Sequence, residues 1–244
     1  MLKDLGVDKV FVVHGKFGYE LREQRVNQLF AKNNIEFEYM TEGDVSNFTP
    51  EILQKYFLPD FFNTISAGHI SCTLNHLIIL EKIIENNFQY TLIFEDDPYF
   101  LGNFKSQLKQ VVEEMKNLPP GFIISLENST LKTPKKREVK QNKVLYPANV
   151  GRCCGAYLID LEGAKKCLAE IKLNKCNAPI DWWHNQIISK NIIQMYWAHP
   201  AFVEQCSHNG ITSSAIEKQQ ISWKRRVSWE IKKFYKLQFL YWIQ

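Results

Sequence analysis

The sequence predicts an α/β fold in which a mostly parallel sheet is flanked by helices. Short apolar segments of strand length alternate along the chain with longer amphipathic segments of helical period. The first such segment, VDKVFVVH at residues 7–14, is apolar nearly throughout, as buried parallel strands are. The chain has 244 residues, 45% of them hydrophobic, which is enough for one large domain with a substantial core.

The first half of the chain predicts three strands separated by helices. A helix at 69–85 is indicated by apolar residues at helical spacing, among them Ile70, Leu74 and Leu77. Pro50 and Pro59 fall in a stretch that otherwise favours a loop with one short helix. The expected order is strand 7–14, helix 19–32, strand 35–40, loop 41–63, helix 69–85, strand 90–94 and a helix over 104–115.

The second half continues the alternation after a polar interruption. Residues 129–143 are basic with little apolar content, and we expect them to form a mobile loop. The expected elements are a strand at 121–127, a strand at 155–160, a helix at 161–171, a helix starting at Ile180 and a strand at 192–200. In such sheets, ligands bind beyond the C-terminal ends of the strands.

The cysteines and the N-terminus predict a cytoplasmic protein. The six cysteines show no CxxC pair and no zinc-ligand spacing, so we expect reduced and mostly buried thiols. The N-terminus has no apolar run of signal-peptide length, and no segment reaches the roughly 18 apolar residues of a membrane span. The protein is therefore expected to touch a membrane only from its cytoplasmic side.

The charge distribution divides the chain into a body, residues 1–221, and a basic tail, residues 222–244. The tail carries six basic residues and one acidic residue, a net +5, so the overall charge of +4 leaves −1 for the body. Seven aromatic residues are interleaved with these cations. Cations and aromatics together favour an anionic membrane surface. Nucleic acid, which we do not expect, and a helix docked on the body are the alternatives.

The segment LIFEDDPYF, residues 92–100, ends an apolar strand in three adjacent carboxylates, Glu95, Asp96 and Asp97. A solvated turn would explain them, but their place after a central strand favours a ligand site. Hard cations such as Mg²⁺ or Mn²⁺ are held by one or two carboxylates together with substrate phosphates. Residues at i and i+2 of an extended chain share a side, so Glu95 and Asp97 are expected to face one ligand.

The same region resembles the core of glycosyltransferase family 25, the lipooligosaccharide sugar transferases. The stretch GHISCTLNHLIILEKIIENNFQYTLIFEDDPYF carries the matching Gly68, His76, Glu95, Asp96 and Asp97. Three further blocks agree: VFVVHGKFGYELREQRV, CGAYLIDLEGAKK and APIDWW. The chain departs from the family's usual opening turn by reading His14, Gly15 and Lys16 after the first strand.

The resemblance implies a GT-A-like fold, a UDP-sugar donor with UDP-galactose first, a divalent metal (Mn²⁺ or Mg²⁺) and transfer with inversion. UDP-glucose and UDP-N-acetylhexosamine are alternative donors. It implies a lipooligosaccharide or lipopolysaccharide core acceptor, linked to lipid, and hence a place on the inner face of the cytoplasmic membrane. The metal ligands are then expected to be Glu95, Asp97 and His208, with His199 as a substitute. The donor is expected to contact Val13, His14, Lys16, Arg22 and Asp96.

An inverting transfer also needs a carboxylate base for the acceptor hydroxyl. Asp181, next to the Trp pair, is the first candidate and Glu127 the second, although Asp181 would equally serve as a helix N-cap. Trp182 and Trp183 are expected either to stack on an acceptor sugar or to pack in the core. Two other functions stay open: a metal-dependent hydrolase or nucleotidyltransferase, and a non-catalytic scaffold attached to the membrane.

Overall fold

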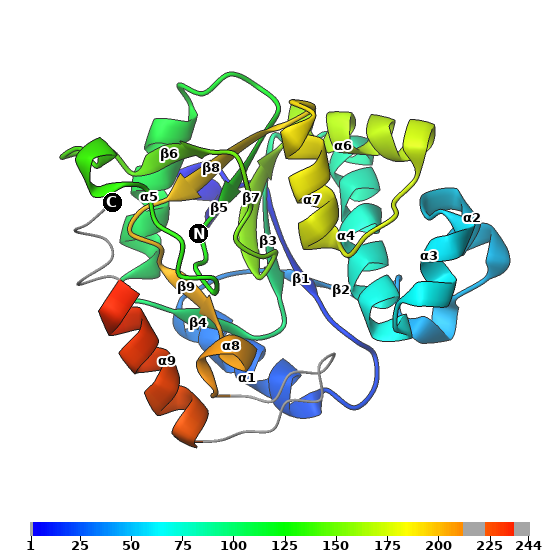
Figure 1. The fold of residues 1–244 in the computed structure, drawn as a ribbon, viewed down its shortest axis with the longest axis horizontal. Coiled ribbons are helices and arrows are strands. Elements are labelled where there is room, and N and C mark those ends of the chain that lie inside the picture. Colours follow the sequence, from blue (N-terminus) through cyan, green and yellow to red (C-terminus); the bar gives the residue numbers. More distant parts are fainter. Residues whose placement is uncertain (1, 212–222, 237–244) are drawn as a thin grey trace.

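The computed structural model describes residues 2–211 and 223–236, and its centre is a seven-stranded sheet (Figure 1). The strand order is β2-β1-β3-β7-β5-β8-β6. Five strands run in one direction, whereas β7 is antiparallel to both its neighbours and β6 is antiparallel to β8. The strands are β1 Lys9–Val13, β2 Glu38–Met40, β3 Tyr90–Glu95, β5 Phe122–Ser125, β6 Leu145–Ala148, β7 Ala156–Asp160 and β8 Gln194–Ala198.

Helices cover both faces of this sheet because its strands are apolar on both sides. In β1, Phe11 and Val13 enter one core cluster while Val10 and Val12 enter the other, as the alternation of a strand requires. The first cluster packs against α4 Ala67–Glu85, α6 Leu161–Asn174 and α7 Ile180–Ser189, and the second against α1 Glu20–Lys32 and α5 Phe104–Met115. The expected α/β architecture, a mostly parallel sheet between helices, is confirmed.

Several short elements differ from the expectation. The stretch 41–63 holds two short helices, α2 Pro50–Tyr56 and α3 Pro59–Thr64, where one was expected. Each begins at a proline, which is favoured in the first helical turn because the missing N–H has no partner there in any case. The antiparallel direction of β7 was also missed, because an apolar run carries no sign of its direction. Three 3-10 helices lie at Leu2–Leu5, Val45–Asn47 and Lys136–Glu138.

A second, two-stranded sheet lies beside the end of β3. Strand β4, Pro98–Phe100, pairs antiparallel with β9, Val203–Gln205, and the short helix α8, Cys206–Asn209, follows directly. This pairing carries a segment more than 100 residues away in sequence to the acidic end of β3. Nothing in the local sequence indicated it, since β4 and β9 have three residues each.

The last described helix, α9 Trp223–Tyr235, lies against the region of β9 and α8 (Figure 1). The part of the basic tail at 237–244, with three of its aromatic residues, lies outside the described residues. None of the helices in the described ranges is both long and apolar enough to cross a bilayer.

Candidate active site

The three carboxylates lie where two parallel strands end side by side. Val13 of β1 is in register with Glu95 of β3, so the residues after both strands meet at one edge of the sheet. A cleft opens there between the start of α1 and the start of α4, and Glu95, Asp96 and Asp97 all line it. Val13, His14 and Arg22, expected to bind the donor, line the same cleft. These residues that the sequence predicted to act together therefore lie together at one edge of the sheet.

Asp96 is fully engaged by the protein. One carboxylate oxygen is 2.8 Å from His14 Nδ1 and the other accepts a hydrogen bond from Arg22 Nη1. Asp96 is 7% exposed. Burial alone would lower the pKa of the Arg22 guanidinium, but the charges of Asp96, Asp97 and Glu95 outweigh it and raise that pKa. The cleft thus contains a permanent cation held next to the acids, a favourable partner for a phosphate group.

Lys16 is not brought to the cleft with the other residues expected to bind the donor. Its Nζ donates a hydrogen bond to Asn47 Oδ1, 2.9 Å away at the surface, and its backbone N–H donates to Asp44 Oδ2. These two hydrogen bonds show that Lys16 holds the loop after β2, and that its ammonium group is directed to Asn47 at the surface. Asp44 itself lines the cleft.

Asp97 is engaged on one side only. Its Oδ2 accepts a hydrogen bond from the Ser207 N–H at 2.8 Å, and its backbone carbonyl accepts one from the Cys206 N–H. Its Oδ1 is buried and has no hydrogen-bond partner among the described residues, and the whole residue is only 2% exposed. A buried carboxylate oxygen without a donor is costly, and the position of Asp97 Oδ1 suits a ligand atom for a cation.

Glu95 occupies a strongly unfavourable place for a negative charge. Its Oε2 accepts a hydrogen bond from Gln205 Nε2 at 2.8 Å, and its Oε1 lies 3.9 Å from His76 Nε2 and 4.0 Å from Cys72 Sγ. Burial, and then repulsion by Asp97 and Asp96, raises the pKa of Glu95 to about 8. Glu95 is therefore largely protonated at neutral pH unless a cation restores its charge.

The two histidines proposed as metal ligands are not gathered with the acids. His208 on α8 is exposed and does not line the cleft, although α8 itself supplies Ser207 to it. His199, after β8, has its ring edge-on against Tyr146. Within residues 2–211 and 223–236, the one cluster of His, Cys and carboxylate ligand atoms is made by Cys72, His76 and Glu95. The expected third ligand, His208, thus has no geometric support.

Asp181 lies in the first turn of α7, near the acidic edge. The N-cap position belongs to Pro179, so the alternative role of Asp181 as the cap is not what the helix uses. Burial raises the pKa of Asp181, and its negative charge in turn helps raise the pKa of Glu95. It lines a small cavity together with Cys153 and His184. Asp181 thus lies near the cluster of three carboxylates but lines a different cavity.

Glu127, the second candidate for the base, is completely buried. Its Oε2 accepts a hydrogen bond from the Ser129 N–H at 2.6 Å, and its Oε1 has no partner. Its backbone carbonyl accepts a hydrogen bond from Arg152 Nη1. Burial raises the pKa of Glu127. It lines neither the cleft nor the small cavity beside Asp181, so it has no route to an acceptor in this conformation.

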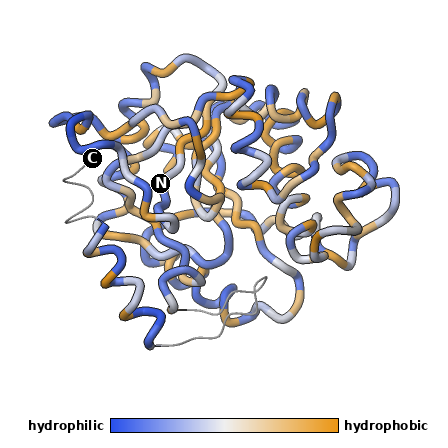
Figure 2. The backbone as a smooth tube through the Cα atoms, in the orientation of Figure 1, coloured by the Kyte–Doolittle hydropathy of each residue, from blue (hydrophilic) through white to orange (hydrophobic). Residues whose placement is uncertain are grey.

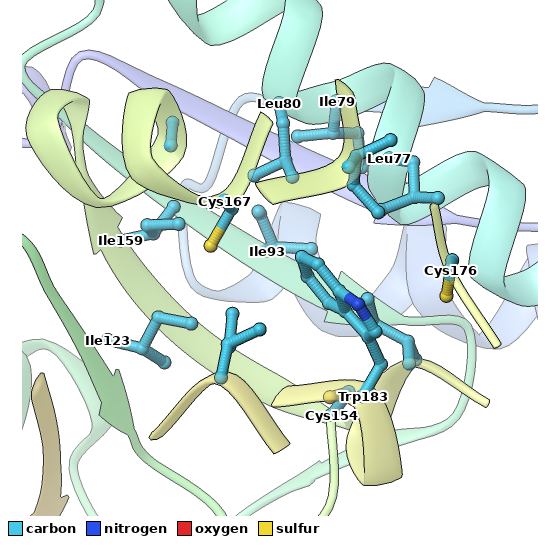
Figure 3. Close-up of a cluster of buried hydrophobic side chains, with 14 of the residues drawn as sticks. Leu77, Ile79, Leu80, Ile93, Ile123, Cys154, Ile159, Cys167, Cys176 and Trp183 are labelled. Carbon is cyan, nitrogen blue, oxygen red and sulfur yellow. The ribbon is translucent and has the colours of Figure 1, made fainter. Parts of the chain in front are cut away.

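The Trp pair separates into one surface ring and one core ring. Trp183 is 2% exposed and packs among Leu77, Ile93 and Cys154 (Figure 3), so its expected contact with a sugar is wrong and its core alternative is right. Trp182 is 65% exposed. Two consecutive helical residues point about 100° apart, which is why only one of them meets solvent.

Two contacts of the acids were not predicted at all. Gln205 and Ser207 hold Glu95 and Asp97, and both come from the segment that the β4–β9 pairing brings in. The third omission, Cys72, had a usable signal. Cys72 and His76 are four residues apart on a predicted helix, so they share a face of α4.

The comparisons with known proteins agree with the sequence resemblance. The family model described as glycosyltransferase family 25 (LPS biosynthesis protein) matches residues 19–183. A human relative named "Inactive glycosyltransferase 25 family member 3" is 24% identical over 203 residues, which cover 80% of this chain and 34% of the relative. A zebrafish (Danio rerio) relative named "Procollagen galactosyltransferase 1" is 23% identical over 205 residues, covering 80% of this chain and 34% of the relative.

The chain therefore spans about a third of the length of these relatives. Among solved structures, a glycosyltransferase involved in the glycosylation of the major capsid of PBCV-1 aligns with 91% of this chain and 99% of its own. The sequence identity is 11% and the TM-score is 0.42.

Proposed function

Because the chain belongs to glycosyltransferase family 25, we propose that it transfers a sugar, galactose first, from a UDP-sugar to a lipooligosaccharide or lipopolysaccharide core acceptor. The observation that carries the proposal is the cleft at the end of β3. It combines a permanently charged Arg22 with Asp97, whose buried Oδ1 has no hydrogen-bond partner. A divalent cation would give Asp97 Oδ1 a partner, and a nucleotide diphosphate would bring negative charge to the guanidinium of Arg22.

The ligand atoms that the cleft offers to a cation are carboxylate oxygens, which suit Mn²⁺ or Mg²⁺. Asp97 would hold it through Oδ1, with help from Glu95, and the diphosphate would complete its coordination. When bound, such an ion offsets the negative charge that grows on the departing diphosphate. Arg22, which lines the same cleft, would add its positive charge to that of the cation. Asp96, occupied by His14 and Arg22, orients these two groups toward the donor.

The acceptor side of the reaction falls to Asp181. Transfer with inversion requires a base on the face of the sugar opposite the diphosphate, and Asp181 is a carboxylate beside the acidic edge that is not itself one of the three. Its raised pKa suits a group that must take a proton. Trp182, exposed next to it, offers a ring face on which an acceptor sugar can stack.

The experiment is a screen of UDP-sugars with the full chain, measuring UDP release with Mn²⁺ and with a chelator. The proposal expects release from UDP-galactose that requires the metal. Release from UDP-glucose or UDP-N-acetylhexosamine instead would change the donor and keep the reaction. Failure to bind any UDP-sugar or Mn²⁺ would contradict the proposal and favour a non-catalytic scaffold; the human relative's name describes that protein as inactive.

For the lipid-linked acceptor, the relevant surface is the outward side of α9. The helix docks through Trp229, which is 9% exposed, through Lys233 to Glu204, and through Arg225 to the Ser207 carbonyl. The docked-helix alternative is therefore right for this side. The opposite side exposes an apolar row, between 48% and 72% of each side chain, made of Trp223, Val227, Ile231 and Phe234.

This apolar row is flanked by the exposed cations Lys224, Arg226 and Lys232. Figure 2 shows apolar and polar residues alternating along α9. An apolar row between cations has the chemistry of a helix that lies on an anionic membrane surface. We propose that α9 places the chain on the inner face of the cytoplasmic membrane, with its docked side joined to the segment that holds Asp97.

Substitution on the outward side tests this better than deletion of the tail, since deletion would also uncover the site of Trp229. Ile231→Glu should weaken binding to anionic vesicles by about tenfold, because it removes one buried apolar side chain and adds repulsion. Leu173→Glu on α6, a residue that is 79% exposed, is the matched control and should leave binding unchanged. Equal binding by the two variants would remove the membrane role from α9.

A further inference from the structure

Helix α4 places a thiol and an imidazole next to the first carboxylate of the acid cluster. Cys72 and His76 lie one turn apart on the same face of the helix, and both face Glu95 at the end of β3. Glu95 Oε1 is 4.0 Å from Cys72 Sγ and 3.9 Å from His76 Nε2. The three ligand atoms all lie within 4.8 Å of one another. These separations are too long for strong hydrogen bonds.

The ring nitrogens of His76 provide an independent observation in favour of a ligand between these groups. Its side chain is 0% exposed, and its Nδ1 is 2.9 Å from Tyr157 Oη. Its Nε2 is buried and has no hydrogen-bond partner, although it is directed at Glu95. If Nδ1 donates its proton to Tyr157, Nε2 carries the free lone pair. That is how an outer partner sets the tautomer of a metal-bound histidine.

We propose that Cys72, His76 and Glu95 form a binding site for a borderline-soft divalent cation such as Zn²⁺. Thiolate, imidazole and carboxylate are the three ligand types of zinc, and three protein ligands leave its fourth position open. Zn–S and Zn–N distances near 2.3 and 2.0–2.1 Å put tetrahedral ligand atoms roughly 3.5 Å apart. The observed separations reach this after side-chain shifts of about 1 Å.

The open position faces solvent through the cleft, because Cys72 and Glu95 both line it. Binding replaces the S–H bond of Cys72 by a sulfur–metal bond and releases the thiol proton to water, together with the carboxyl proton of Glu95 where Glu95 is protonated. This site differs in ligand class from the all-oxygen site proposed at Asp97. Glu95 has one oxygen toward Cys72 and His76 and the other held by Gln205. The inference does not depend on sugar transfer.

The test is a titration of the metal-free full chain with Co²⁺, which reports a thiolate ligand by a sulfur-to-cobalt charge-transfer band. Wild type should bind one equivalent with this band, and Zn²⁺ should remove it by displacement. Cys72→Ser should abolish the band and weaken Zn²⁺ binding by at least tenfold. Cys153→Ser is the matched control, since Cys153 is also partly exposed and lies beside Asp181, and it should retain the band.

Asp97→Asn separates this inference from the proposed function, because it removes the oxygen site and should leave the thiolate band in place. Circular dichroism checks that each variant is folded. The inference is overturned if wild type shows no thiolate band, if Cys72→Ser shows the same band as wild type, or if the band disappears in Asp97→Asn.

Discussion

Asp96 and Asp97 are neighbours in sequence and line one cleft, yet their surroundings are opposite. Asp96 has a partner on each oxygen, His14 on one and Arg22 on the other. Asp97 has the Ser207 N–H on one oxygen and nothing on the other, in an almost fully buried position. Glu95 resembles Asp97, because its charge is opposed by burial and by both aspartates.

Asp96 is thus held by protein partners on both oxygens, whereas Asp97 and Glu95 are each held closely on one oxygen only, and the proposed function assigns the cation to these two. A paired, buried carboxylate holds structure, whereas an unpaired one is tolerated where a cation or substrate completes it. Each prediction below separates these two kinds of carboxylate.

The largest expected effect is on stability, in Asp96→Ala. The substitution removes the shared acceptor of His14 and Arg22 and should lower the free energy of unfolding by about 3 kcal/mol, as for other buried pairs that lose one member. Asp97→Ala is the matched comparison. It loses one hydrogen bond, worth about 1 kcal/mol, and relieves repulsion with Glu95. Urea unfolding in the presence of a chelator measures the free energy of unfolding of both variants. Equal decreases in the two variants would contradict the difference between Asp96 and Asp97.

A smaller but clear effect is expected on rate in Asp181→Asn. Asparagine keeps the size of the side chain and removes the base, so transfer should fall by about a hundredfold while UDP affinity stays the same. Steady-state kinetics with a soluble acceptor, together with UDP calorimetry, separate the two quantities. Transfer close to that of wild type would move the base elsewhere, with Glu127 examined next despite its burial.

A third effect is a dependence of stability on pH that Glu95→Gln removes. The pKa of Glu95 is about 8 in the folded chain and about 4.3 when unfolded. Between these values the folded state holds a proton that the unfolded chain has lost, so wild-type stability falls as pH rises through this window.

Glutamine imitates the protonated side chain. Glu95→Gln should therefore raise the Tm at pH 8, by roughly 2–4 °C for each kcal/mol recovered, and the gain should shrink toward pH 4.5. Thermal unfolding in chelator at both pH values is the measurement. Glu36→Gln, at an exposed glutamate, is the control. An increase in Tm that is the same at both pH values would contradict the raised pKa of Glu95.

The local parts of this site were predictable from sequence, and the distant parts were not. A strand that ends in three acids, and parallel strands whose ends coincide, were enough to group Val13, His14 and Arg22 with Glu95, Asp96 and Asp97. Gln205 and Ser207 were missed because they depend on a three-residue strand pairing with no local signal. The sequence did not show which of Trp182 and Trp183 is buried, because two adjacent residues of a short helix point in different directions and either one can face the core.

The most direct test of the central claim is calorimetry of UDP binding, with and without Mn²⁺, in wild type and Asp97→Asn. The claim is that Asp97 Oδ1 is an oxygen ligand for a cation that also contacts the nucleotide. Wild type should bind UDP far more tightly with Mn²⁺, and Asp97→Asn should lose this dependence while it stays folded. A variant that keeps the metal-dependent affinity of wild type would contradict the claim.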